Sequence, residues 1–142
     1  MTPDEHVTVV RRLIDECVNT HRADLLDDTV APDVRVHPAT PGAAPDTVGI
    51  EDLRAAFHGF RVVFGDLHIT VDDVVAAGDR VAVRWTAEGV HVGELAGIPA
   101  TGRQVRWGGI DLYRLDGGKI AEWWRNDDHA GLLSQLTAAA PV

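Results

Sequence analysis

The chain has 142 residues, of which 45% are hydrophobic and 25% charged, and its net charge at pH 7 is −9. Such a chain fits one globular domain, residues 1–142, with a buried core and room for a modest ligand cavity. An acidic chain without a Lys/Arg-rich run is not expected to bind nucleic acid or an anionic membrane, and it disfavours a highly anionic substrate unless a local arginine site captures it. No apolar stretch approaches the roughly 20 residues of a membrane span. The polar, acidic N-terminus does not resemble a secretory signal, so we expect a cytoplasmic protein.

The first half of the chain is predicted to be mainly helical. Thr2, Pro3 and Glu5 form a capping-box pattern, and apolar residues at helical spacing continue the first helix to about Thr20. The single cysteine, Cys17, lies on the apolar face of this helix and is expected to be an inert core thiol. A short helix at 23–28 and a strand at 34–38 follow. A third helix begins near Ile50, with Leu53 and three phenylalanines on one stripe, and ends before Gly65.

The second half has the period of strands. Alternating residues predict strands at 67–71, 81–86, 105–115 and 120–126, with turns at Gly78-Asp79 and at DGGK, and a short helix closes the chain. Three helices followed by antiparallel strands indicate an α+β protein, with the helices on one face of a curved sheet. A conical pocket between the sheet and the helices is expected.

Several segments of the chain carry a family resemblance. They are Val36-His37-Pro38, GVHVGE at 89–94, GIPATGR at 97–103, GKI at 118–120 with Glu122, Trp124 and Asp128, and GLL at 131–133 with Gln135-Leu136. Through them the chain resembles the SnoaL-like polyketide cyclases, also called ester cyclases, over nearly its whole length. This resemblance implies the cone-shaped α+β fold of ketosteroid isomerase and nuclear transport factor 2, also called cystatin-like, in which a curved antiparallel or mixed sheet wraps around helices.

Asp128 is the first candidate for catalysis. Asp directly before a helix is a favoured N-cap, which stabilises the ionised carboxylate and weakens it as a base. The resemblance implies instead an acid/base role, for which apolar walls must raise the pKa of the carboxyl group. Trp124, four residues earlier, is expected to supply such a wall. Whether Asp127 or Asp128 faces the pocket stays open at this point.

The other candidate site residues are two histidines and three aromatic residues. His91 is expected at a strand end, where it would hydrogen-bond or polarise a substrate carbonyl, and His37 is a weaker candidate of the same kind. Phe57, Trp107 and Trp124 are expected to form flat walls around an aromatic substrate. Trp85 is expected in the core or at a subunit contact. The histidines show no metal-ligand spacing, so we predict no metal site.

The resemblance implies an enzyme of antibiotic biosynthesis that closes a ring of an aromatic polyketide, or its ester, by a cofactor-free intramolecular aldol reaction. Two alternatives stay open: a cofactor-independent hydroxylase of an aromatic polyketide, and a non-catalytic small-molecule-binding protein. No cofactor is expected. An apolar outer face of the sheet favours association. The resemblance implies the same, since the resembling families form dimers or higher oligomers, so we expect a homodimer or a homotetramer.

Overall fold

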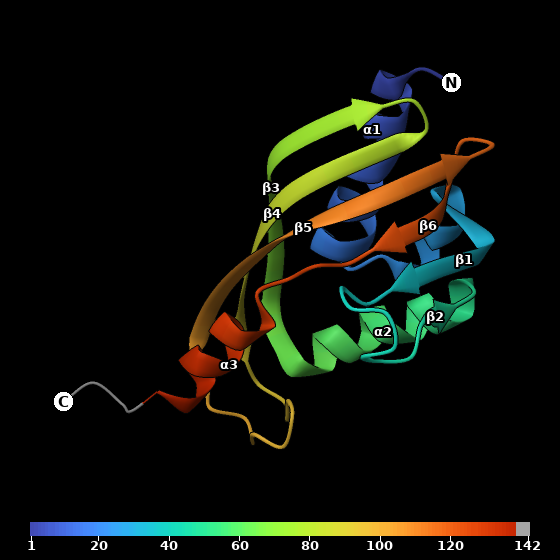
Figure 1. Cartoon of the computed structure of the whole chain (residues 1–142). Coiled ribbons are helices and arrows are strands. Elements are labelled where there is room, and N and C mark those ends of the chain that lie inside the picture. Colours follow the sequence, from blue (N-terminus) through green and yellow to red (C-terminus); the bar gives the residue numbers. More distant parts are fainter. Residues whose placement is uncertain (139–142) are drawn as a thin grey trace.

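The computed structural model describes residues 1–138. The protein is an α+β structure in which a curved sheet wraps around helices, as expected (Figure 1). Its elements in chain order are α1 (Pro3–Arg12), η1 (Leu13–Asn19), η2 (Ala23–Asp28), β1 (Val30–His37), β2 (Thr47–Val48), α2 (Ile50–Val63), β3 (Phe64–Ala77), β4 (Arg80–His91), β5 (Gln104–Asp116), β6 (Lys119–Trp124) and α3 (His129–Thr137).

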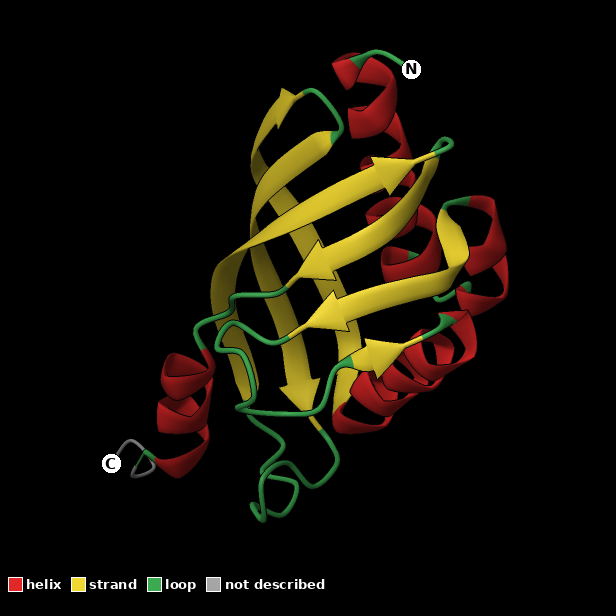
Figure 2. Ribbon diagram, turned by 45° about the vertical axis from the view of Figure 1, so that its right-hand side comes forward, coloured by secondary structure: helices red, strands yellow, loops and turns green. Residues whose placement is uncertain are grey.

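The six strands form one mixed sheet in the order β2-β1-β6-β5-β4-β3. Neighbouring strands are antiparallel except for β1 and β6, which are parallel. The long strands β3, β4 and β5 bend strongly along their length, so that the sheet encloses the helices on its concave side (Figure 2). This curvature creates the space in which a ligand site can form.

The helices behave as their sequences predict. Thr2 accepts a hydrogen bond from the Glu5 backbone N–H while the Glu5 side chain bonds back to Thr2, so the predicted capping box is present. The first helical stretch does end at Asn19, but its second part, η1, has the wider π-helical winding. Of the predicted stripe, α2 buries Ile50, Leu53 and Phe57, while Phe60 is half-buried and Phe64 belongs to β3. Apolar faces of both helices therefore cover the concave side of the sheet.

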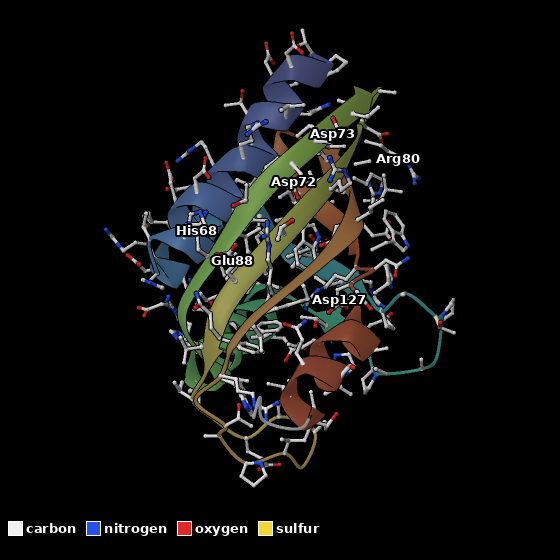
Figure 3. All side chains as sticks on the ribbon, turned by 90° about the vertical axis from the view of Figure 1, so that its left-hand side faces the viewer. His68, Asp72, Asp73, Arg80, Glu88 and Asp127 are labelled. Carbon is white, nitrogen blue, oxygen red and sulfur yellow. The ribbon has the colours of Figure 1, made fainter. Side chains whose placement is uncertain are left out.

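Alternation along β4 and β5 decides which side chains face inward. Val81, Val83 and Trp85 on β4 are buried, and on β5 every second residue from Val105 to Leu115 faces the same way. Trp85 therefore belongs to the interior, and the alternative, a subunit contact on the outer face, is wrong. The outer face carries charged side chains, among them Asp72 and Glu88 (Figure 3), and Asp72 lies 3.8 Å from the guanidinium of Arg84.

Three differences from the predicted elements matter for the site. β3 is far longer than the predicted 67–71 and already contains Gly65, because the chain passes directly from helix to strand at Phe64. The short strand β2 forms within the Pro- and Gly-rich loop and pairs with β1. β6 ends at Trp124, two residues before the predicted end. The segment after Trp124 is irregular, so strand alternation cannot be counted through it.

Candidate functional site

Two adjoining cavities lie between the sheet and the helices. The inner cavity has a volume of about 80 Å³ and the outer one about 360 Å³. Because a single water needs only ~10–15 Å³, the inner cavity accommodates the edge of a planar ring and the outer one more of a ligand. Both cavities share Phe60, Trp107 and Arg125 in their walls, and these three residues mark the boundary between them.

The inner cavity is almost entirely apolar. Residues from η1, α2, β3, β4, β5 and β6 form its walls, so it lies at the centre of the fold. The most important wall residues are Phe57, Leu67, Trp85, Tyr113 and Trp123. Among these side chains a single carboxylate is present, that of Asp111 on β5. An ionisable group in such surroundings is the feature that most clearly suggests chemistry.

Asp111 is held in place by two hydrogen bonds. The indole Nε1 of Trp123 donates to Oδ2 at 2.9 Å, and the backbone N–H of Asn126 donates to Oδ1 at 3.1 Å. Each oxygen accepts one bond there, and a carboxylate has about four acceptor sites, so capacity remains for a substrate proton. The orientation of the carboxylate is therefore fixed without closing it to a ligand.

Burial is the main influence on the charge of Asp111, whose side chain belongs to a residue only 4% exposed. Removal from water raises the pKa of the Asp111 carboxyl above its ordinary value. The bonds from Asn126 and Trp123 and the positive charge of Arg125 act in the opposite direction and limit the rise. The result is a carboxylate that is a stronger base than a solvated one, which general acid/base catalysis requires.

Arg125 lies at the boundary between the two cavities. Its guanidinium lies 5.0 Å from the ring centre of Phe60 and 5.6 Å from that of Trp123. Within residues 1–138 no carboxylate lies within ion-pairing distance of it. A cation without a partner, close to the base, is suited to stabilise negative charge that develops on a bound molecule.

The two adjacent aspartates after β6 have different positions. Asp127 lines the outer cavity, and its backbone pairs with Gly109 of β5. Asp128 is exposed and caps α3, because its Oδ1 accepts a hydrogen bond from the Gly131 backbone N–H at 2.9 Å. The expected apolar wall beside Asp128 is therefore wrong: the carboxylate that lies in a dry interior is Asp111.

His91, the second predicted catalytic residue, is fully buried behind the cavity walls. Its ring tilts against Phe64, which lines the outer cavity, and is not itself part of either wall. The backbone N–H of Thr101 donates to Nδ1 at 3.1 Å, which places the proton of a neutral ring on Nε2. His91 therefore fastens the 92–103 loop to the end of β4.

His37 lies in the outer cavity, where two carboxylates hold it. Its Nε2 lies 2.7 Å from Glu122 and its Nδ1 3.0 Å from Asp46. The hydrogen bond that Glu122 accepts is the main cause that raises the pKa of His37, and the same bond lowers the pKa of Glu122. Because both ring nitrogens are engaged, His37 contributes a wall of the cavity rather than a free hydrogen-bond donor.

The predicted aromatic walls are only partly where the sequence placed them. Phe57 lines the inner cavity and Trp107 lines both cavities. Trp124 does not face either cavity; its ring packs on His37 with centroids 5.5 Å apart and lies under Arg80. The inward tryptophan of the pair is Trp123. The side chain of Trp123 faces inward because its indole bonds to Asp111. Successive side chains of a strand point to opposite faces, so Trp124 must face outward.

Two site residues, Asp111 and Arg125, were missed at the level of sequence. The signal for Asp111 was present: it shares strand parity with Val105, Trp107 and Tyr113, and an acid on the apolar face of an alternating strand is unusual. Arg125 follows the doubled tryptophan where regular pairing ends, so no periodicity marks its direction.

The described residues contain no group of three or more His, Cys, Asp or Glu side chains arranged to hold a metal ion. In the same part of the chain no helix is long and apolar enough to cross a membrane. Cys17 is buried in the wall of the inner cavity, where desolvation raises the pKa of its thiol to about 11. The thiol is therefore protonated and a poor nucleophile at neutral pH.

Comparisons with known proteins agree on one family. The profile of the SnoaL-like polyketide cyclases matches residues 8–136. Aklanonic acid methyl ester cyclase DnrD of Streptomyces peucetius is 31% identical over 140 residues, which are 96% of this chain and 93% of DnrD. The structure of TsrD from Streptomyces laurentii has a TM-score of 0.85 at 31% identity, covering 98% of this chain and 99% of TsrD. AclR of Streptomyces galilaeus, a proposed hydroxylase, has a TM-score of 0.82 at 25% identity, covering 99% of this chain and 86% of AclR.

Proposed function

The chain belongs to the SnoaL-like polyketide cyclase family, and we propose that it closes a ring of an aromatic polyketide by an intramolecular aldol reaction with Asp111 as the acid and base. It is an enzyme of the cyclase class in antibiotic biosynthesis, as its named relatives are. The substrate class follows from those relatives and from the aromatic walls of the cavities. The assignment of Asp111 rests on the geometry of this chain.

The reaction needs one proton to leave a carbon and to reach an oxygen. Asp111 removes a proton from a carbon flanked by carbonyl groups, and the electrons of that C–H bond enter the conjugated system of the substrate. The resulting carbanion attacks a ketone of the same molecule and forms the new C–C bond. Protonated Asp111 then delivers its proton to the new alkoxide, so the enzyme returns to its starting state.

Three features of the site assist this sequence. Burial makes Asp111 a stronger base and, once protonated, leaves it able to donate to the alkoxide. Arg125 stabilises the negative charge while it is spread over the substrate. Phe57, Trp107 and Trp123 hold a planar substrate in the folded shape in which carbanion and ketone meet, and such positioning contributes several kcal/mol, up to ~7–11 in favourable cases.

The two residues that sequence favoured for catalysis receive indirect roles in this proposal. Asp128 holds the first turn of α3 and so fixes the adjacent Asp127 in the wall of the outer cavity. His91 holds Thr101 and the 92–103 loop behind Phe64. Both have structural roles in this proposal, and neither contacts the reacting atoms. His37 remains a proposed wall of the substrate site, and Trp124 supports that wall from behind.

The observation that carries the proposal is the carboxylate of Asp111 in an otherwise apolar cavity. We expect Asp111→Asn to reduce turnover of aklanonic acid methyl ester, the substrate in the name of DnrD, by ~10²–10⁴-fold. Asp128→Asn is the matched control, because asparagine is also a good N-cap and the same charge is lost; its turnover should stay within about twofold of wild type.

Folding is checked separately, since the side-chain amide in Asp111→Asn offers one acceptor atom where Trp123 and Asn126 supply two donors. Circular dichroism and quenching of tryptophan fluorescence by the substrate show whether the Asp111→Asn variant is folded and still binds. A folded, binding variant that retains turnover excludes Asp111 as the base. Loss of turnover in Asp128→Asn with Asp111→Asn active would return the role to Asp128.

A cofactor-independent hydroxylase is the second candidate function, favoured by the likeness to AclR. In that reaction the same deprotonation by Asp111 produces an electron-rich substrate anion that reacts with molecular oxygen. An oxygen electrode separates the two functions. Ring closure proceeds without oxygen uptake, whereas hydroxylation consumes one O₂ for each substrate molecule.

We further propose that the protein forms a homodimer or homotetramer through the outer face of the sheet. Val75, Ala82 and Leu112 lie side by side across β3, β4 and β5 on this face; Val75 and nearby Ile110 are exposed, and Ala82 and Leu112 are half-buried. Light scattering of wild type and an Ile110→Glu variant tests this interface. A cytoplasmic location stays a prediction, for which cell fractionation is the test.

A further inference from the structure

Arg61 is the second arginine that reaches the inner cavity. It follows Phe57 by four residues on α2, and therefore lies on the same face of the helix as the buried stripe. The neighbouring walls are aliphatic and aromatic, including Leu13, Val18 and Ile69. A guanidinium in such a wall is costly to maintain unless it serves a ligand.

The guanidinium of Arg61 has no partner among the described residues. Its Nη2 is buried and makes no hydrogen bond within residues 1–138, and none of the ion pairs in that part of the chain involves Arg61. Burial is the single cause acting on the pKa of Arg61, which it lowers. A half-buried cation with one donor buried and unpaired is an arrangement that an anionic group of a ligand completes.

Arg61 and Asp111 act at separate points of the cavity. Arg61 extends from α2, whereas Asp111 belongs to β5 and Arg125 follows the end of β6, so the charged groups enter the cavity wall from different elements. A substrate in this site has one reacting end at Asp111 and one anchored end at Arg61.

We propose that the natural substrate carries a free carboxylate, which Arg61 binds in the inner cavity. This inference rests on the proposed function, because it names the class of polyketide on which that same site acts. A planar carboxylate matches the two parallel N–H donors of a guanidinium, while a methyl ester lacks the charge and one strong acceptor. The arginine also explains how a chain of net charge −9 binds an anion.

Binding of simple anthraquinones tests the proposal without turnover. The probes are anthraquinone-2-carboxylate, its methyl ester and 2-hydroxyanthraquinone, with quenching of tryptophan fluorescence as the signal. We expect wild type to bind the carboxylate at least tenfold more tightly than the ester, and Arg61→Met to lose this preference. Arg84→Met, which removes the same charge from the outer face of the sheet, should keep it. Arg125→Met should keep it as well.

Four results would overturn the proposal. The first is that wild type binds the ester as tightly as the carboxylate or more tightly. The second and third are that Arg61→Met keeps the preference for the carboxylate over the ester, or that Arg125→Met alone loses it. The fourth is that ionised 2-hydroxyanthraquinone binds most tightly, which would make a phenolate the ligand. Thermal unfolding supplies a second readout: Arg61→Met removes a donor that is buried without a partner and should raise the Tm of the ligand-free protein, whereas a structural role of Arg61 predicts a lower Tm.

The failure of this proposal and that of the proposed function are distinguishable. Asp111→Asn should bind the carboxylate probe with the same preference over the ester as wild type, because Arg61 is intact. If Asp111→Asn retains turnover, the assignment of the base is wrong and the binding preference still stands. If Asp111→Asn loses turnover while wild type shows no preference, the carboxylate anchor is wrong and the base still stands.

Discussion

Trp123→Phe changes the environment of Asp111 by removing a single hydrogen bond. Phenylalanine keeps an aromatic ring next to Tyr113, whose ring centre lies 4.9 Å from that of Trp123, but it lacks the N–H that donates to Oδ2 of Asp111. That bond stabilises the ionised form and lowers the pKa of Asp111. Loss of this hydrogen bond should therefore raise the pKa of Asp111 further, because, of its two hydrogen bonds, only the one from Asn126 would remain to oppose the effect of burial.

The size of the shift follows from the strength of the bond. A hydrogen bond to a charged group contributes about 1.5–3 kcal/mol, and one pKa unit corresponds to about 1.36 kcal/mol. The indole also bonds, more weakly, to the neutral acid, so only part of this energy distinguishes the two protonation states. We expect the pKa of Asp111 to rise by about 1 unit, and by no more than about 2.

The pH dependence of kcat/KM measures this shift. Activity that requires ionised Asp111 rises with pH through the pKa of the free enzyme, and in Trp123→Phe the midpoint of this rise should move to higher pH. Trp124→Phe is the control, because Trp124 packs on His37 at the outer face and should leave the midpoint unchanged. An unshifted midpoint in Trp123→Phe would mean that the group controlling activity is not Asp111.

Three further predictions concern stability. The hydrogen bond to Glu122 raises the pKa of His37, so the interaction of protonated His37 with Glu122 stabilises the folded protein. This contribution is complete below about pH 6.5, the ordinary pKa of histidine, and is lost as pH rises through the higher pKa of His37 in the folded protein. Glu122→Gln should therefore make the free energy of unfolding, measured with urea, fall less steeply over this pH range. Gly109→Ala places a Cβ 2.5 Å from a backbone carbonyl oxygen and should lower the free energy of unfolding by ~1–3 kcal/mol. The Cβ of Gly59→Ala on α2 meets nothing within 4 Å, so this variant should raise the free energy of unfolding by ~0.5–1 kcal/mol. Asp128→Ala should lower stability by ~1 kcal/mol through the lost cap and leave kcat/KM within about twofold.

Each of these has a result that contradicts it. An unchanged pH dependence in Glu122→Gln would show that His37 titrates with little help from that carboxylate. Equal melting temperatures for Gly109→Ala and Gly59→Ala would mean that β5 and the segment after β6 are not packed as described. A large fall in kcat/KM for Asp128→Ala, with stability restored by Asp128→Asn but activity not, would assign Asp128 a chemical role.

The regular parts of the fold were predictable because their periodicity is strong. The apolar stripe of α2 and the capping box at Thr2 are local patterns, and both are present. The alternation of β4 and β5 is equally clear, since one face of each strand is buried. Pairing of β2 with β1 was not predictable, because a two-residue strand shows no periodicity and the pairing depends on how the Pro- and Gly-rich loop before it folds back onto β1.

The candidate site lies where the sequence predicts it in general terms, but the carboxylate that lines the inner cavity is Asp111, whereas Asp128 caps α3. In a strand that continued to Asn126, Trp124 would share the inward direction expected of Asp128. The strand ends at Trp124, and Trp123 faces inward because its indole reaches Asp111 on the neighbouring strand. Parity within a single strand is readable from sequence, but which face is concave depends on the partner strand.

Hydrogen exchange on the substrate tests the assignment of Asp111 most directly. Aklanonic acid methyl ester incubated with enzyme in D₂O is sampled before ring closure is complete, and deuterium at the carbon flanked by carbonyls is followed by mass spectrometry. Wild type and Asp128→Asn are predicted to catalyse this exchange, and folded Asp111→Asn is predicted to leave it at the uncatalysed rate. Exchange at the wild-type rate by Asp111→Asn would contradict the account.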